Sequence, residues 1–251
     1  MSRDAWQIRR TERDSVRIGI LQPGYLPWLG FFEQVYRSDV FVIYDDVQYD
    51  KEGWRNRNRI KSANGIQWLT VPVHVKFKDR PLVHEVRIDN KTNWRKKHLL
   101  SLKTSYAKAP FFANYIGVFE EAYSMEWERL ADLDMHFIMK LLGLLGMGGK
   151  KIVRSSALGV SGDRFERLVS ICKMFRADVF YEGAAGREYL DGAYFEAQGI
   201  KIEYQDYKHP VYRQLHGEFI PYLSVVDLLF NQGEESLPIL AGKNSAEVID
   251  K

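Results

Sequence analysis

The sequence holds a single cysteine, Cys172, among its 251 residues. One cysteine excludes a disulfide or a cysteine-based metal site within one chain. Because its neighbours in LVSICKMF are apolar, we expect Cys172 to be a buried helix residue rather than a nucleophile. No apolar run approaches the roughly 20 residues of a membrane span, and the charged start, MSRDAWQIRRTERDS, lacks the hydrophobic core of a secretory signal. These absences predict a cytoplasmic protein with no membrane span.

Several familiar active-site motifs are also missing. The sequence has no Walker A loop, no GxGxxG, no GxSxG and no HExxH, and no two of its six histidines have zinc-binding spacing. No metal site is therefore predicted from a motif, and no cofactor is indicated. A Mg²⁺ ion held through phosphates by Asp45 or Asp46 stays open.

What is present is typical of a globular protein rich in aromatic residues. Hydrophobic residues make up 45%, charged residues 27% and aromatic residues 14% of the chain. The formal net charge is only +3, but cations cluster at residues 51–61 and 95–108. Clustered cations favour an anionic small molecule as ligand. A nucleic-acid partner is not expected, because the broader basic signature of such proteins is lacking.

The hydrophobic pattern predicts an α/β fold. Short apolar, β-branched runs alternate with segments of helical spacing, which favours parallel strands joined by crossover helices. The turn signal ANG at 63–65 predicts an antiparallel pair as well. We therefore expect a polar extension over residues 1–15, and a single domain over 16–251 with a Rossmann-like mixed sheet and a helical insertion at 91–148. The expected strands are 16–21, 40–46, two within 54–75, 82–89, 150–158, 178–182 and 200–207; the expected helices are 28–38, 93–109, two within 111–147, 161–177 and 222–233.

Three of these strands end in polar residues, at positions where ligands bind in open α/β sheets. The ends are Gln22 to Tyr25, Asp45 to Tyr49, and Tyr181 to Gly186, and we expect all three loops to line one pocket. Side chains alternate along a strand, so Asp46 should face the pocket and Asp45 should be buried and structural. The candidate residues in these loops are Gln22, Tyr25, Trp28, Gly30, Asp45, Asp46, Gln48, Glu182, Gly183 and Tyr189.

Two further segments carry candidate residues. In KEGWRNRNRIK, an extended chain places the arginines on one face and the asparagines on the other, which suits recognition of phosphate, carboxylate or sugar. Solvated charges on an edge strand would look the same. His98 is the best acid–base candidate among the histidines, because its neighbourhood is polar and cationic, although a lone helical histidine is often structural. The candidates from these segments are Lys51, Asn56, Arg57, Asn58 and His98.

One set of segments follows in order between residues 16 and 233: ILQPGYLPWLGFFEQ, SDVFVIYDDVQYDKEGWRNRNRIK, WLTVPV, NWRKKH, SYAKAPFF, RLVSICK, YEGAAGREYL and HPVYRQLHGEFIPYLSVVDLLFNQG. Through these segments the chain resembles the WbqC-like family. The resemblance implies a link to bacterial surface-polysaccharide (O-antigen) gene clusters. Glu182 departs from the family pattern, in which a small polar residue is expected. The family motif carries over to Gln22, Pro23, Pro27, Trp28, Gly30, Asp45, Asp46, Gln48, Trp54, Asn56, Arg57 and Asn58.

A second likeness concerns the fold. The opening strand, turn, helix and acidic strand end are similar to those of nucleotidylyltransferases, but Trp28 to Phe31 stand where those enzymes carry a His-x-Gly-His turn. Nucleotidyl transfer by that mechanism is therefore not expected. The resemblances together suggest a transferase that modifies a nucleotide- or lipid-linked sugar in surface-glycan synthesis, by N-acylation or aminoacylation of an amino sugar. The alternative is a non-catalytic nucleotide- or sugar-binding protein of the same pathway.

Overall fold

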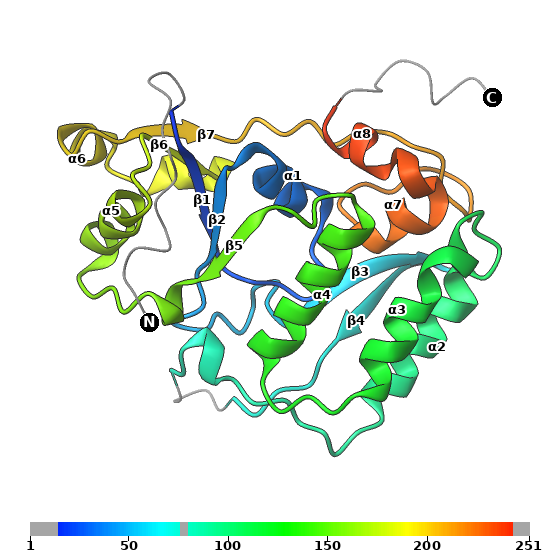
Figure 1. Ribbon diagram of the computed structural model, residues 1–251. Coiled ribbons are helices and arrows are strands. Elements are labelled where there is room, and N and C mark those ends of the chain that lie inside the picture. Colours follow the sequence, from blue (N-terminus) through cyan, green and yellow to red (C-terminus); the bar gives the residue numbers. More distant parts are fainter. Residues whose placement is uncertain (1–14, 76–79, 243–251) are drawn as a thin grey trace.

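A five-stranded parallel sheet forms the centre of the protein. The computed structural model describes residues 15–75 and 80–242. Each strand pairs in parallel with its neighbours, in the order β5-β2-β1-β6-β7 (Figure 1). Counted along the chain within this sheet, the order is third, second, first, fourth, fifth, as in a Rossmann-like fold. The strands are β1 (Arg17–Leu21), β2 (Val40–Ile43), β5 (Lys151–Arg154), β6 (Val179–Glu182) and β7 (Lys201–Tyr204).

The predicted antiparallel pair is a separate hairpin. Strands β3 (Arg57–Ser62) and β4 (Gly65–Thr70) pair antiparallel around the expected turn, where Gly65 has a positive φ of 95°. They form a two-stranded sheet of their own. The α/β prediction is confirmed, but the parallel and antiparallel strands belong to two sheets rather than to one mixed sheet.

Helices cover both faces of the parallel sheet (Figure 1). One face carries α5 and α6, which pack against Ile18, Val42 and Phe180. The other carries α1, α4, α7 and α8, whose apolar residues form one core with Phe41 and Ile43. The expected insertion supplies α2, α3 and α4. The helices are α1 (Leu29–Arg37), α2 (Trp94–Tyr106), α3 (Phe112–Ser124), α4 (Leu130–Leu144), α5 (Arg164–Met174), α6 (Gly192–Ala197), α7 (Val225–Gln232) and α8 (Ser236–Leu240), with short 3₁₀ helices η1 (Val83–Glu85), η2 (Ser155–Ala157), η3 (Ala184–Glu188) and η4 (Gly233–Glu235).

One expected strand, residues 82–89, is not formed. Its first half is the 3₁₀ turn η1, in which the backbone N–H of Leu82 donates to the Glu85 carboxylate at 2.8 Å. Such a local hydrogen bond competes with strand pairing. The isolated bridges Gln48–Leu82, Val73–Ile88 and Arg87–Arg129 remain of the extended structure.

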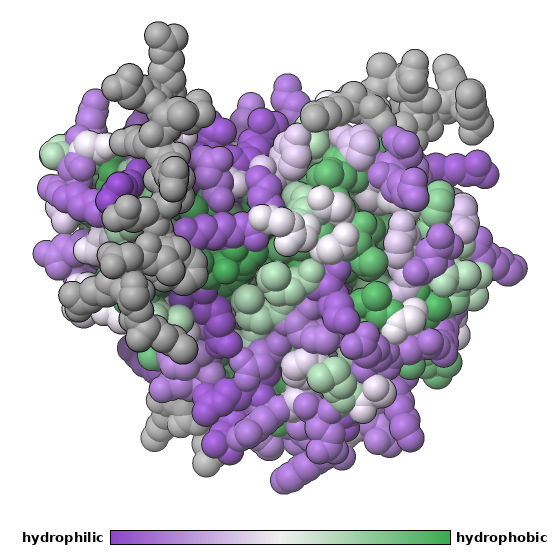
Figure 2. Space-filling model, in the orientation of Figure 1, coloured by the Kyte–Doolittle hydropathy of each residue, from purple (hydrophilic) through white to green (hydrophobic). Residues whose placement is uncertain are grey.

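The surface seen in Figure 2 is most apolar in its middle, around β5 and α4, and hydrophilic over most of its periphery. Within the described ranges, no helix combines the length and apolarity that a membrane crossing requires. The expected extension over residues 1–15 lies outside the described residues except for Ser15.

Candidate functional site

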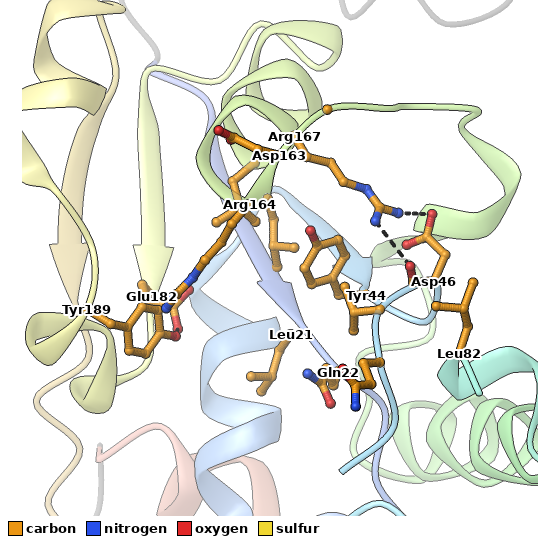
Figure 3. A pocket seen from close by; sticks show the side chains of 15 residues that line it. Leu21, Gln22, Tyr44, Asp46, Leu82, Asp163, Arg164, Arg167, Glu182 and Tyr189 are labelled. Atoms are coloured by element: carbon orange, nitrogen blue, oxygen red, sulfur yellow. Dashed lines mark hydrogen bonds and ion pairs between the residues drawn. The ribbon is translucent and has the colours of Figure 1, made fainter. Parts of the chain in front are cut away.

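A pocket of about 570 Å³ lies beyond the carboxyl ends of β1, β2 and β6. The strand order reverses direction between β1 and β6, which is where ligands bind in open α/β sheets. As expected, residues after all three strands line it (Figure 3). We call it the switch-point pocket. Its charged residues are Asp46, Asp163, Arg164, Arg167 and Glu182.

Glu182 ends β6 and is the most perturbed carboxyl group in this pocket. Its side chain is 7% exposed, and the Tyr189 hydroxyl donates a hydrogen bond to its Oε1 at 3.3 Å. Burial raises the pKa of Glu182 to about 7. Gly186 makes room for it, because a Cβ there would collide with the Glu182 side chain. A carboxyl group that titrates near neutrality in a pocket is suited to act as a general acid or base.

Two arginines stand at the start of α5. Asp163 caps this helix by accepting the N–H groups of Phe165 and Glu166, both at 3.0 Å. Arg164 lies over the Tyr189 ring at 4.4 Å. Arg167 forms an ion pair with the Asp46 carboxylate. Cations at a helix N-terminus oppose the helix dipole, so this arrangement favours a ligand that brings negative charge, such as a phosphate.

The two neighbouring aspartates differ in environment. Asp45 is fully buried and accepts hydrogen bonds from the Ser156 N–H at 3.0 Å and from Arg154 Nε at 2.5 Å. Burial alone would raise the pKa of Asp45, but these hydrogen bonds more than offset it, so the pKa lies below its ordinary value. Asp46 lines the pocket and also accepts a hydrogen bond from the Ser155 hydroxyl. Asp45 is thus a structural residue and Asp46 a pocket residue, as the alternation predicted, even though β2 ends at Ile43.

A second pocket, of about 380 Å³, adjoins the first. Both are lined by Leu21 and Gln22. The Gln22 Oε1 atom is buried and has no hydrogen-bond partner among the described residues. We call this second pocket the aromatic pocket, because two tryptophans and a tyrosine line it together with polar side chains. Its polar and aromatic lining residues are Gln22, Trp28, Phe31, Trp54, Arg55, Asn58, Arg59 and Tyr222.

Comparison of the sequence with known proteins identifies one family. The model of the WbqC-like protein family matches residues 22–239. The chain belongs to the WbqC-like protein family. It is 36% identical over 222 residues to the uncharacterized protein Rv1507c of Mycobacterium tuberculosis (strain ATCC 25618 / H37Rv), an alignment that covers 88% of this chain and 95% of that protein. No solved structure matches.

Several predicted site residues of this WbqC-like chain line the two pockets. Gln22, Asp46, Gln48, Glu182 and Tyr189 line the switch-point pocket. Trp28 and Asn58, together with Gln22, line the aromatic pocket. Among the described residues, no group of three or more His, Cys, Asp or Glu side chains is placed to hold a metal ion.

The structure places His98 and Tyr25 outside both pockets. The Tyr25 hydroxyl is 2.9 Å from His98 Nδ1 and also contacts the Tyr123 hydroxyl. His98 is 6% exposed and lines neither pocket, and burial lowers its pKa to about 4. Both side chains belong to the aromatic core between α2, α3 and α4, where neutral His98 serves as a hydrogen-bonding core residue.

Other predicted residues shape the pockets without lining them. Gly30 is buried beneath the Trp28 ring, which a Cβ would overlap. The Asn56 amide donates to the Val71 carbonyl at 2.8 Å. Arg57 donates to the Glu52 carbonyl at 2.5 Å and lies over the Trp68 ring. Each of these three residues makes contacts within the protein, and the ligand contacts predicted for them stay predictions.

Three more predicted residues also lie outside both linings. Lys51 is exposed in the loop before β3. Gly183 follows Glu182 but does not line either pocket. Asp45 is held by Ser155, Ser156 and Arg154 beneath the switch-point pocket lining.

Sequence reasoning missed Arg164 and Arg167. The signal was in SGDRFER, where a capping aspartate is followed by two arginines one helical turn apart. Arginines at that end of a helix oppose its dipole. Tyr222 gave no sequence signal, because a loop far along the chain brings it to the aromatic pocket.

Proposed function

We propose that this protein is a transferase that modifies a phosphate-activated amino sugar, with N-acylation or aminoacylation as the reaction. The switch-point pocket binds the phosphate groups through Arg164 and Arg167. Glu182 is the general base. Asp46 orients the substrate through its contacts with Arg167 and Ser155.

The chemistry follows from the roles of these groups. The amine of the sugar attacks the carbonyl carbon of the acyl donor, so a C–N bond forms and the bond to the donor's leaving atom breaks. Glu182, with a pKa of about 7, accepts the proton that the amine releases. Glu182 then returns this proton to the leaving group as it departs. Side chains that line one pocket hold the reacting groups together and lower the entropic part of the barrier.

The observation that carries the proposal is that Glu182, Arg164 and Arg167 line one pocket, at the point where the strand order reverses. An anion site beside a carboxyl group that titrates near neutrality is typical of an active site. Family membership supports the choice of a glycan substrate, through the link to surface-polysaccharide genes that the resemblance implies. The cytoplasmic location expected from the sequence stays a prediction.

Calorimetric titration of the full chain with uridine diphosphate and other nucleoside diphosphates tests the anion site. Arg164→Gln should weaken binding roughly 10- to 100-fold, because a hydrogen bond to a charged group contributes about 1.5–3 kcal/mol. Arg187→Gln is the matched control, since Arg187 is exposed and lines neither pocket. Equal affinities of the two variants, or no nucleotide binding at all, would overturn the proposal.

Turnover separates the transferase from a non-catalytic binding protein. Nucleotide-linked amino sugars are incubated with acyl-CoA or aminoacyl donors, and the N-acylated product is measured by mass spectrometry. Glu182→Gln should keep nucleotide affinity and lose product formation. Nucleotide binding without any product over a broad donor panel would favour the binding protein.

A further inference from the structure

The aromatic pocket offers stacking surfaces at its rim. Trp54 is 45% exposed and Tyr222 is 50% exposed, and both line it. Trp28 contacts the Tyr222 ring, with the ring centroids 5.7 Å apart. Exposed aromatic faces around a hollow of about 380 Å³ suit a ring-shaped ligand of small-molecule size.

The backbone holds Tyr222 in an unusual conformation. Its φ is 59°, in the left-handed region that non-glycine residues seldom occupy. The Tyr222 carbonyl accepts a hydrogen bond from Arg59 at 2.8 Å, and its N–H donates to His209 Nε2 at 3.1 Å. Such strained residues cluster at ligand-binding sites. The surrounding contacts therefore keep the Tyr222 ring at the rim of the pocket.

Two arginines, Arg55 and Arg59, also bring positive charge to the pocket. Within the described part of the chain, neither Arg55 nor Arg59 forms an ion pair. The Nε atoms of both are buried and have no hydrogen-bond partner among the described residues. Arg55 donates to the Pro23 carbonyl at 3.1 Å and interacts with Asp50 and Asp134 at longer range. Burial raises the pKa of Asp134 well above its ordinary value, so this carboxyl group favours its neutral form.

We propose that the aromatic pocket is a second substrate site, which binds a sugar ring that carries a carboxylate. The ring stacks on Trp54 and Tyr222, and Arg55 and Arg59 bind the carboxylate. This inference rests on the proposed function, in which the switch-point pocket binds a phosphorylated partner. Because the two pockets share Gln22, a ligand in one lies next to a ligand in the other.

A nucleobase would also stack on these rings, but the polar groups favour the acidic sugar. The cations in this pocket are the guanidinium groups of Arg55 and Arg59, which match a carboxylate and form no ion pair among the described residues. Asn58 would be the natural amide to read the edge of a base, but it already donates to the Leu26 carbonyl at 2.7 Å and accepts the Arg59 N–H at 2.8 Å. A base is therefore an outcome of the test rather than the proposal.

The experiment is calorimetric titration of the full chain with methyl glucuronide, methyl glucoside and uridine. We expect the glucuronide to bind at least tenfold more tightly than the other two. Trp54→Ala should weaken glucuronide binding at least tenfold, and Arg59→Gln should bring its affinity close to that of the glucoside. Ile66→Ala is the control, because Ile66 is equally exposed at 45% on the hairpin and does not line the pocket.

The outcomes are separate from those of the nucleotide titration. Binding of uridine in preference to the glucuronide, with loss in Trp54→Ala, would overturn the inference and place a base in this pocket. Equal affinity for glucuronide and glucoside, or loss in Ile66→Ala as large as in Trp54→Ala, would also overturn it. Nucleoside diphosphate binding that depends on Arg164 but is unaffected by Trp54→Ala would leave the proposed function intact in each of these cases.

Discussion

At the scale of single residues, the protonation of Glu182 decides when the proposed reaction runs. A general base acts in its deprotonated form, and burial raises the pKa of Glu182 to about 7. The value of kcat/KM should therefore rise about tenfold per pH unit below pH 7 and become constant above it. A pH–rate profile of the acyl transfer measures this. A rate that is already constant from pH 5 upward would exclude Glu182 as the base.

The same raised pKa predicts an effect on stability that does not depend on any activity. Between the ordinary value of 4.5 and about 7, the folded protein holds a proton on Glu182 that the unfolded chain has released. Stability from this group is thus lost as pH rises through that window. Relative to wild type, Glu182→Gln should gain about 3 kcal/mol of unfolding free energy between pH 5 and pH 8.5. Urea denaturation at both pH values measures it, and a pH-independent difference would contradict the assignment.

The two adjacent aspartates should respond differently to the same substitution. Asp45→Asn puts an amide where Arg154 and the Ser156 N–H donate, and breaking a buried ion pair costs about 3 kcal/mol or more. Asp46→Asn leaves the core untouched and should stay folded but lose turnover, because Arg167 loses the carboxylate that positions it. Thermal melting and the acyl-transfer assay of both variants check this. Early melting of Asp46→Asn with normal melting of Asp45→Asn would reverse the assignment.

At the scale of elements, the N-terminus of α5 positions the arginines of the anion site. Asp163→Ala removes two cap hydrogen bonds and should cost about 1 kcal/mol of stability. Because Arg164 and Arg167 lie in the turns that this cap fixes, nucleotide affinity should fall as well. Asp191→Ala removes the cap of α6, where Asp191 accepts the Tyr194 N–H at 3.2 Å, and provides the control. Similar losses of affinity in both variants would show that the effect is general destabilisation.

The sequence predicted most elements, because their signals are local. The apolar runs of β1 and β2 and the capping box of α5 are read directly from neighbouring residues. The strand predicted at 82–89 is wrong because the Glu85 carboxylate accepts a hydrogen bond from the Leu82 N–H. This local bond competes with strand pairing, and the alternation of apolar and polar residues does not reveal it. The burial of His98 was not predicted, because its surroundings on α2 are polar in sequence but the core of α3 and α4 covers it in space.

At the scale of the whole molecule, the strand order creates the site. β1 lies at the centre of the sheet, so the chain leaves it toward β2 on one side and later returns to β6 on the other. The three loops therefore meet although residues 22 and 182 are far apart in the sequence. The hairpin and the helices of the insertion lie outside this sheet, and the hairpin supplies Asn58 and Arg59 to the aromatic pocket. One pocket thus comes from the Rossmann-like sheet and the other from its junction with the hairpin and the loop before it.

Gln22 joins these two parts of the molecule and should affect both ligands. It follows β1, lines both pockets and has a buried Oε1 without a partner among the described residues. We expect that oxygen to accept a hydrogen bond from a ligand, or from bound water, in either pocket. Gln22→Ala should therefore weaken both nucleoside diphosphate binding and glucuronide binding by a few-fold, because a neutral hydrogen bond contributes about 1 kcal/mol. Arg164→Gln should weaken only the nucleotide, and Trp54→Ala only the glucuronide. Loss confined to one ligand in Gln22→Ala would mean that the two pockets work independently, although they share a wall.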